Sequence, residues 1–187
     1  SPSDADMVYT YELKVDINKL IDADLEIDAE DSFFNEFGIT TPQSGYNGLN
    51  LLGVQKKNDE ENNSMRFVSL ISSDVLKNVK EYGYVFTRTS KNTDTAKENA
   101  GKLTLENGLK CDCTGTVNSM TGDYGSGDFN ASSYKYVTAA VNNINEDKAI
   151  VARLYVIDND GITHYGSYID SENSAWDGCA ARLGDLG

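Results

Sequence analysis

Short stretches in which apolar and polar residues alternate, separated by turn-forming residues, run through most of this chain and restrict the folds open to it. In the first stretch, Tyr9, Tyr11, Leu13 and Val15 share one face of a predicted strand. The same period of two predicts strands over residues 7–15, 23–29, 65–72, 84–89, 102–105, 109–116, 134–141, 149–157 and 162–169. Short helices are predicted over residues 73–80 and 93–100. We therefore expect an all-β fold: an antiparallel β-sandwich (Greek-key-like) or Greek-key barrel, with two short helices and long loops.

Two turn motifs predict hairpins within this pattern. Asn107-Gly108 is a strong hairpin signal between the strands expected at 102–105 and 109–116. Asn159-Asp160-Gly161 is expected to turn the chain into the strand at 162–169 through a type I′ turn, because these residues tolerate a positive φ.

The length of the chain, 187 residues, fits one domain, and its 39% of hydrophobic residues can supply a core. We expect one β-sandwich-like module over residues 1–187. Residues 1–52 are expected to form an N-terminal strand and loop extension packed on a core of residues 53–169. Within the extension, Pro42 and the glycines around it predict a loop over residues 40–52.

The charge of the chain excludes some classes of partner. The net charge is −14, from 30 acidic and 16 basic residues. Nucleic acids and anionic membranes are bound by clustered Lys and Arg, so we expect no nucleic-acid partner. We also expect no membrane insertion, because no apolar run approaches the ~20 residues that span a bilayer.

The acidity has two explanations, solubility and calcium binding, and we expect no cofactor unless calcium is one. Asp158-Asn159-Asp160-Gly161 resembles a metal loop but lacks the register and the distal Glu of a calcium-binding loop. A second acidic cluster comprises Asp22, Asp24, Asp28, Glu30 and Asp31.

The sequence offers little for catalysis, so we expect that the protein is not an enzyme. His164 is the only histidine, and it lies in an alternating strand, which suits a packing or surface residue. A pair of carboxylates could in principle serve a glycosidase, but no spacing among the 30 acids distinguishes such a pair.

The three cysteines, Cys111, Cys113 and Cys179, leave several states open. Residues two apart on a strand are too distant for a relaxed disulfide, so Cys111 and Cys113 are not expected to bond to each other. A disulfide from either one to Cys179 is the expected state in an oxidising compartment; free thiols and a metal site are the alternatives.

Aromatic residues are the remaining functional signal. Sugars bind by laying their C–H faces on aromatic rings while amides and carboxylates accept their hydroxyls. Tyr82, Tyr84 and Phe86 share one strand face, and Tyr134 and Tyr136 share another; these residues are expected to be in the core or half-buried. Rings in loop sequences are better candidates, and we expect ligand contacts from Tyr46, Asn47, Asp123, Tyr124, Trp176 and Asp177.

Part of the chain resembles a known group of modules. The similarity lies in strand sequences between residues 53 and 169: Gly53-Val54-Gln55, Met65-Arg66-Phe67-Val68, Glu81-Tyr82-Gly83-Tyr84-Val85, Tyr134-Lys135-Tyr136-Val137-Thr138, Val151-Ala152-Arg153-Leu154-Tyr155 and Asp160-Gly161. These resemble modules of large extracellular proteins of gut ruminococci and related clostridia, including proteins of the starch adherence system that assembles amylosomes.

The resemblance implies a secreted, cell-surface-associated, non-catalytic module, monomeric within a larger multidomain protein. Its motifs are structural, so no binding residue follows from it. With the loop aromatics, it favours a carbohydrate-binding module for α-glucan, such as starch or a maltooligosaccharide. The alternative is a structural or protein-binding module of a bacterial surface adhesin or scaffold protein.

Overall fold

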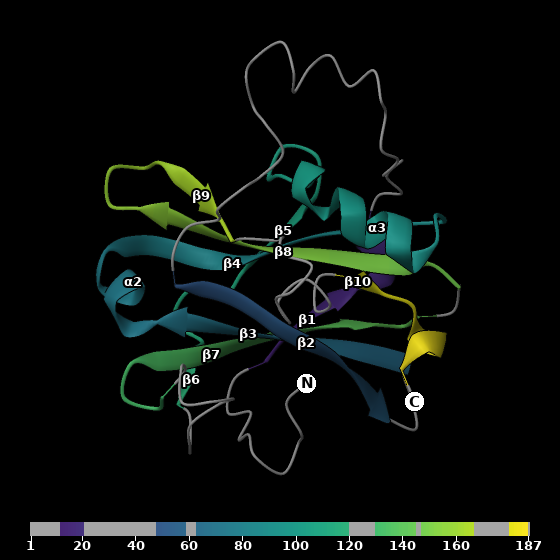
Figure 1. Cartoon of the computed structure of the whole chain (residues 1–187), viewed down its shortest axis with the longest axis horizontal. Helices are drawn as coiled ribbons and strands as arrows, with labels where there is room; N and C mark the ends of the chain where they lie inside the picture. The colour runs from purple at the N-terminus through teal and green to yellow at the C-terminus, as the bar shows by residue number, and fades with distance from the viewer. Residues whose placement is uncertain are drawn as a thin grey trace.

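The alternating segments form two β-sheets that pack face to face (Figure 1). The computed structural model describes residues 12–20, 48–58, 63–119, 130–144, 147–166 and 180–186. The first sheet has the order β1 (Leu13–Asp16), β7 (Tyr134–Asn142), β3 (Asn63–Ser72), β2 (Leu49–Asn58), and β6 (Asn118–Ser119) also pairs with β7. The second sheet has the order β10 (Ala180–Ala181), β8 (Ala149–Asp158), β4 (Val79–Thr89), β5 (Leu109–Asp112), and β9 (Thr163–Tyr165) also pairs with β8.

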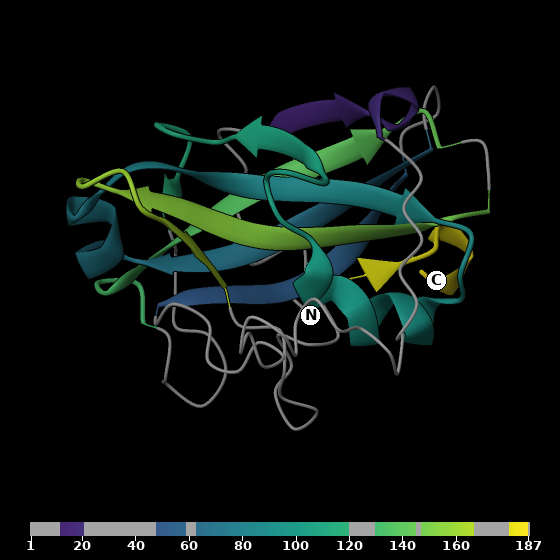
Figure 2. The same ribbon diagram turned by 90° about the horizontal axis from the view of Figure 1, so that it is seen from above.

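Two connections lead from a central strand of the first sheet to a central strand of the second. The β3–β4 connection contains α2 (Ser73–Lys77), and a connection of the same length joins β7 to β8. Each crossing links a central strand of one sheet to a central strand of the other, and the long strands of both sheets run along the long axis of the molecule (Figure 2). These features confirm the predicted β-sandwich. One pairing differs from the expected antiparallel pattern, because β1 runs parallel to β7.

The core lies between the sheets and contains the aromatic strand face that the alternation predicts. Tyr84 and Phe86 of β4 are fully buried and stack with ring centroids 5.4 Å apart. Phe67 of β3 packs edge-on against Phe86 at 5.3 Å. The hydroxyl of Tyr84 lies 2.8 Å from the carbonyl oxygen of Val137 and 2.7 Å from Ser69 Oγ, so it is hydrogen-bonded across the sandwich. Burial raises the pKa of Tyr84 well above its usual value, so the hydroxyl stays neutral.

Both predicted helices are present, and each begins at a capping side chain. Ser72 Oγ accepts the amide of Val75 at the start of α2, and Asn92 Oδ1 accepts the amide of Thr95 at the start of α3 (Thr93–Asn99). Helix α2 ends earlier than expected because Val79 already pairs with β8 as the first residue of β4. Shorter 3₁₀ turns cover Ile17–Lys19, Ala100–Lys102 and Leu183–Asp185.

The hairpin predicted around Asn107-Gly108 is wrong. The side chain of Asn107 accepts the amide of Thr104 through Oδ1 and donates to the carbonyl of Lys102 through Nδ2. These bonds close a compact turn where the strand at 102–105 was expected, and β5 pairs with β4 instead. An Asn side chain that bonds the backbone in this way competes with strand pairing.

The hairpin between β8 and β9 is confirmed, but its turn is not type I′. A type I′ turn needs a positive φ at both central residues, whereas in this turn only Gly161 has one, at +85°. Asp158 Oδ1 accepts the amides of Asp160 and Ile162, both at 2.9 Å, and the amide of Gly161 bonds to the carbonyl of Asp158. The carboxylate therefore stabilises a turn that ends on one left-handed glycine.

One smaller expectation changed at the margin of the first sheet. The loop expected over residues 40–52 ends earlier, because Leu49 already begins β2 and is buried in the core. The strand expected over residues 23–29 lies outside the described residues, as do residues 1–11.

Candidate functional site

The six residues expected to bind ligand lie outside the described residues: Tyr46, Asn47, Asp123, Tyr124, Trp176 and Asp177. They belong to three segments, 21–47, 120–129 and 167–179. The described residues that flank these segments show where each one joins the sandwich.

Each of the three segments has at least one junction at the same end of the sandwich, beside α2. The first segment begins elsewhere, after Leu20, because β1 ends where Asp16 pairs with Asn142 at the far end of β7. Gly48 follows the first segment, and its carbonyl accepts the amide of Ser72 at 2.9 Å. Ser133, close after the second segment, accepts the amide of Ser73 at 2.8 Å. Gly166 precedes the third segment and lies against Leu49, since a Cβ built on it would be 3.5 Å from the Leu49 Cβ.

Figure 1 shows this arrangement on its left side, where α2 lies with the beginnings of β2 and β7. We call this region the α2 end. The second segment is also preceded by a residue of this end, because Ser119 of β6 pairs with Lys135 near the start of β7. The third segment returns farther along the second sheet, where Ala180 pairs with Val151.

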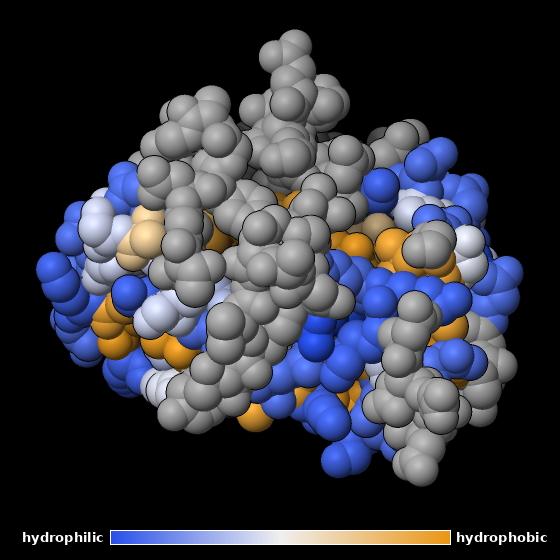
Figure 3. Space-filling view, turned by 90° about the horizontal axis from the view of Figure 1, so that it is seen from below, coloured by the Kyte–Doolittle hydropathy of each residue, from blue (hydrophilic) through white to orange (hydrophobic). Residues whose placement is uncertain are grey.

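The outer face of the first sheet carries a second apolar cluster, separate from the core between the sheets. Val68, Leu70 and Tyr136 are fully buried there, and Leu52 and Tyr134 pack against them half-buried. From below, the described part of the surface has small, separate apolar patches among polar residues (Figure 3). The centre of this sheet is therefore not an open platform.

The outer face of the second sheet is closed by the segment around α3. Arg153 of β8 donates from Nη1 to the carbonyls of Gly101 and Leu103, at 2.9 and 3.1 Å. Its guanidinium lies 4.5 Å from the centroid of the Tyr165 ring, and the Tyr165 hydroxyl accepts the amide of Leu105. A charged side chain thus fixes this segment onto the sheet through charge-assisted and cation–π contacts.

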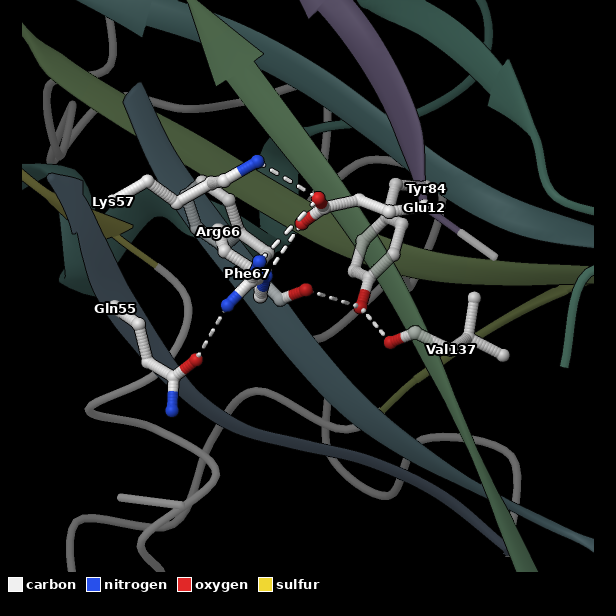
Figure 4. Close-up of polar contacts among 7 residues, drawn as sticks. All are labelled: Glu12, Gln55, Lys57, Arg66, Phe67, Tyr84 and Val137. Carbon is white, nitrogen blue, oxygen red and sulfur yellow. Dashed lines mark hydrogen bonds and ion pairs between the residues drawn. The ribbon is translucent and has the colours of Figure 1, made fainter. Parts of the chain in front are cut away.

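The strongest polar cluster of the described residues surrounds Glu12 (Figure 4). Its carboxylate lies 2.5 Å from Nε of Arg66 on β3 and 2.9 Å from Nζ of Lys57 on β2. Arg66 Nη1 also lies 3.4 Å from the side-chain oxygen of Gln55. Burial raises the pKa of Glu12, but the hydrogen bonds from Arg66 and Lys57 outweigh burial and leave this pKa below its usual value. A carboxylate held ionised in this way can stabilise the packing of the segment at Glu12 against β2 and β3, but it is not suited to donating a proton.

The Glu12 cluster predicts a pH dependence of folding. An unfolded glutamate titrates near pH 4.3, roughly, and the folded pKa of Glu12 is lower, so the unfolded chain binds more protons between the two values. The stabilisation by Glu12 is therefore complete above about pH 5 and is lost as the pH falls through the folded pKa. We expect Glu12→Gln to cost about 1–2 kcal/mol at pH 7 and to flatten the loss of stability as the pH falls below about 5.

Urea unfolding at a series of pH values tests this expectation. Glu106→Gln, at an exposed turn position, is the matched control and should leave the curve unchanged. Equal slopes for Glu12→Gln and the parent chain would show that Glu12 is not a source of the acid sensitivity.

The only histidine, His164, is bound to Asp158 with 2.8 Å between Nε2 and Oδ2. The hydrogen bond from His164, followed by the bond from the Ile162 amide, lowers the pKa of Asp158. Because the other oxygen of Asp158 binds the turn amides, the pair ties β9 to its turn. The same carboxylate is thereby engaged at the motif that resembled a metal loop.

Metal ligands do not gather in the part of the chain that the structure describes. Among those residues, no three His, Cys, Asp or Glu side chains lie together in a way that could hold a metal ion. The acidic cluster from Asp22 to Asp31 lies outside the described ranges. The structure has no helix, within those ranges, that is long and apolar enough to cross a membrane.

The predicted disulfide from Cys179 to Cys111 or Cys113 is wrong for this structure, in which both Cys111 and Cys113 are buried free thiols. Their side chains belong to the core between the sheets, and Cys113 Sγ lies 3.5 Å from the carbonyl oxygen of Cys111. Cys179 itself lies outside the described residues.

Sequence reasoning missed the Glu12 cluster and the role of Arg153. The available signal was a charged residue within an otherwise apolar strand: Arg66 lies between Met65 and Phe67, and Arg153 lies between Ala152 and Leu154. Buried charges are paired, so each of these arginines implied a partner elsewhere in the chain.

The chain was also compared with known proteins. It matches no protein-family model, no curated protein and no solved structure.

Proposed function

We propose that this chain is a non-catalytic carbohydrate-binding module of an exported protein, with α-glucan such as starch or a maltooligosaccharide as its ligand. The observation that carries the proposal is the convergence at the α2 end. Three segments with candidate aromatic residues join the sandwich around Gly48, Ser133 and Gly166. Residues that are far apart in the sequence can therefore contribute to one binding surface.

The two sheet faces support an end-on site. The residues at the centre of the outer face of the first sheet are buried. The outer face of the second sheet is covered by the segment around α3 that Arg153 binds. A glycan platform needs exposed rings with polar neighbours, and the described residues provide none on either central face. The segments that have a junction at the α2 end remain as candidates, and Tyr46, Tyr124 and Trp176 belong to these segments in the sequence.

Two carboxylates held in ion pairs, Glu12 and Asp158, are unsuited to general acid catalysis. Glu12 is held by two cations and Asp158 by His164 and two amides, and the pKa of each is lowered. A general acid needs a raised pKa to hold its proton near neutrality. Neither group has that property.

The expected ligand contacts predict a specific pattern of binding. Trp176→Ala, Tyr124→Ala and Tyr46→Ala should each weaken binding of maltoheptaose by roughly 5- to 150-fold, corresponding to ~1–3 kcal/mol for one stacked ring. Binding should be nearly independent of salt, since a neutral glycan gains little from charge attraction. Titration calorimetry measures both effects, and circular dichroism verifies that each variant folds.

Ser90→Ala is the matched control, because Ser90 is exposed just beyond β4 at the end opposite to α2. Its affinity should equal that of the parent chain. If the three aromatic variants fold and bind like the parent, the ligand site lies elsewhere. If the parent binds no α-glucan, cellulose, xylan or pectin, the module is a structural or protein-binding module of a surface protein.

A further inference from the structure

The two central strands of the first sheet, β3 and β7, are buried on their outer face. Phe67 and Val137 belong to the core between the sheets, so alternate residues on each strand point outward. These outward residues are at most 8% exposed: Arg66, Val68, Leu70, Tyr136, Thr138 and Ala140. Thr138 and Ala140 have short side chains, so their burial requires atoms that lie above the sheet. A sheet that is buried on both faces is covered on both.

We propose that the outer face of β3 and β7 is the docking surface of residues 1–11 of the same chain. Among the described residues, Leu52 and Tyr134 pack against the apolar part of this face, and both are only half-buried. The rest of the cover therefore comes from outside the described ranges. The inference is independent of the proposed ligand, and it rests on the position of Glu12 and on the strand that occupies the edge of β7.

The contacts of Glu12 indicate the side of the sheet from which the chain arrives. Glu12 directly precedes β1, which is separated from β3 by β7 and from β2 by both of these strands. Its carboxylate nevertheless bonds to Arg66 on β3 and to Lys57 on β2 (Figure 4). These side chains meet above the outer face, so the chain that enters Glu12 approaches from this face.

The strand order closes the other path, which would continue β1 along the edge of β7. Leu13 lies opposite Ala139 in a parallel pairing, so a longer β1 would place residues 9 and 10 opposite residues 135 and 136. On this edge β6 already pairs with residues 135 and 136, and β3 occupies the other edge of β7. The chain before Glu12 therefore leaves the plane of the sheet. It does so level with Tyr136 and the apolar cluster.

The length and composition of residues 1–11 suit this surface. The outward residues of β3 from Arg66 to Leu70 extend over roughly 13 Å, a distance that about four extended residues span. Residues 7–11 read Met-Val-Tyr-Thr-Tyr, so four of the five are apolar or aromatic. Tyrosine suits such a cover because its ring packs on apolar side chains while its hydroxyl reaches water.

Photo-cross-linking of the full chain tests which segment covers the face. Benzoylphenylalanine replaces Tyr9 in one variant and Tyr11 in another, and each folded protein is irradiated and digested with trypsin. The outward apolar residues of β3 fall in the tryptic peptide 67–77, and those of β7 fall in the peptide 136–148. We expect at least one of the two variants to yield, from the monomer, the peptide 1–14 joined to 67–77 or to 136–148.

Phe34 is the matched position for this experiment, because residues 21–47 are the other long segment that joins the first sheet. Benzoylphenylalanine at Phe34 should join its own peptide to neither 67–77 nor 136–148. The proposal is wrong if neither tyrosine position reaches these two peptides, or if the joined peptides come only from a cross-linked dimer. Cross-links from Phe34 alone would assign the cover to residues 21–47, and those from the dimer would assign it to a second copy.

Protection of a thiol at position 138 tests whether residues 1–11 close the face. Thr138 is 1% exposed, and its peptide 136–148 contains no cysteine, so alkylation of Thr138→Cys is measured separately from that of the native thiols. Adding Tyr9→Ser and Tyr11→Ser should raise the rate of alkylation by iodoacetamide at least about tenfold, since the loss of a buried side chain shifts an opening equilibrium by about one decade.

Ile162→Ser is the control for this measurement, because Ile162 is apolar but 56% exposed at the turn between β8 and β9. It should leave the rate of alkylation at position 138 unchanged. Circular dichroism verifies that each variant folds. An unchanged rate in the folded variant with both tyrosine substitutions would contradict the proposal.

Discussion

Tyr84→Ala is expected to lower the free energy of unfolding by about 3–5 kcal/mol, the largest effect that we expect from a single substitution in this chain. The ring is fully buried, stacks on Phe86 and lies 6.5 Å from Phe67, so truncation leaves a cavity between the sheets. The substitution also removes the hydroxyl that joins the two sheets at Val137 and Ser69. Equilibrium unfolding in guanidinium chloride measures the loss.

Two further variants separate the ring from the hydroxyl. Tyr84→Phe keeps the ring and should cost about 1–3 kcal/mol, because Val137 and Ser69 each lose their hydrogen bond with the hydroxyl. Tyr134→Ala, at a half-buried position on the outer face of the first sheet, should cost less than Tyr84→Ala. A loss below about 1 kcal/mol for Tyr84→Ala would contradict the central place of this ring in the core.

Gly83→Ala is expected to cost about 3 kcal/mol, through a clash with the backbone and not through a cavity. A Cβ at this position would overlap the carbonyl oxygen of Cys111 and lie 3.0 Å from the amide nitrogen of Cys113. Backbone atoms of a paired strand cannot rotate away, so β5 must move relative to β4. The expected result is a lower unfolding midpoint together with faster alkylation of Cys111 in the folded, reduced protein.

Gly184→Ala is the matched control for this substitution, because nothing lies within 4 Å of a Cβ built there and no positive φ is recorded for it. It should leave both the unfolding midpoint and the alkylation rate unchanged. If Gly83→Ala is as stable as the parent chain, the close approach of β5 to β4 is not required by the fold.

The alternation of side chains determined the two-sheet architecture because a period of two places one apolar face on each strand. Burying such faces requires two sheets, and the predicted strands 65–72, 134–141 and 149–157 correspond closely to β3, β7 and β8. Local chemistry also located both helices, since Ser72 and Asn92 can cap helices whatever the rest of the fold.

The prediction from local sequence was wrong where a short motif is compatible with two different turns. Asn107-Gly108 suits a hairpin, but the same Asn side chain can bond to Lys102 and Thr104 and close a different turn. In the structure Leu103 is buried and its carbonyl accepts a hydrogen bond from Arg153 of β8, and this contact favours the compact turn. That contact joins residues about fifty positions apart, so no local window contains it.

The polar clusters and the candidate site depended on the tertiary structure for the same reason. Glu12 meets Lys57 and Arg66 across 45 and 54 positions of sequence, and β1 reaches them by a parallel pairing with β7 that the alternation cannot encode. The sequence by itself determined the strands and nominated the aromatic segments. Only the register of the strands decided that Gly48, Ser133 and Gly166 lie at one end, because pairing between distant strands fixes where each connecting segment begins and ends.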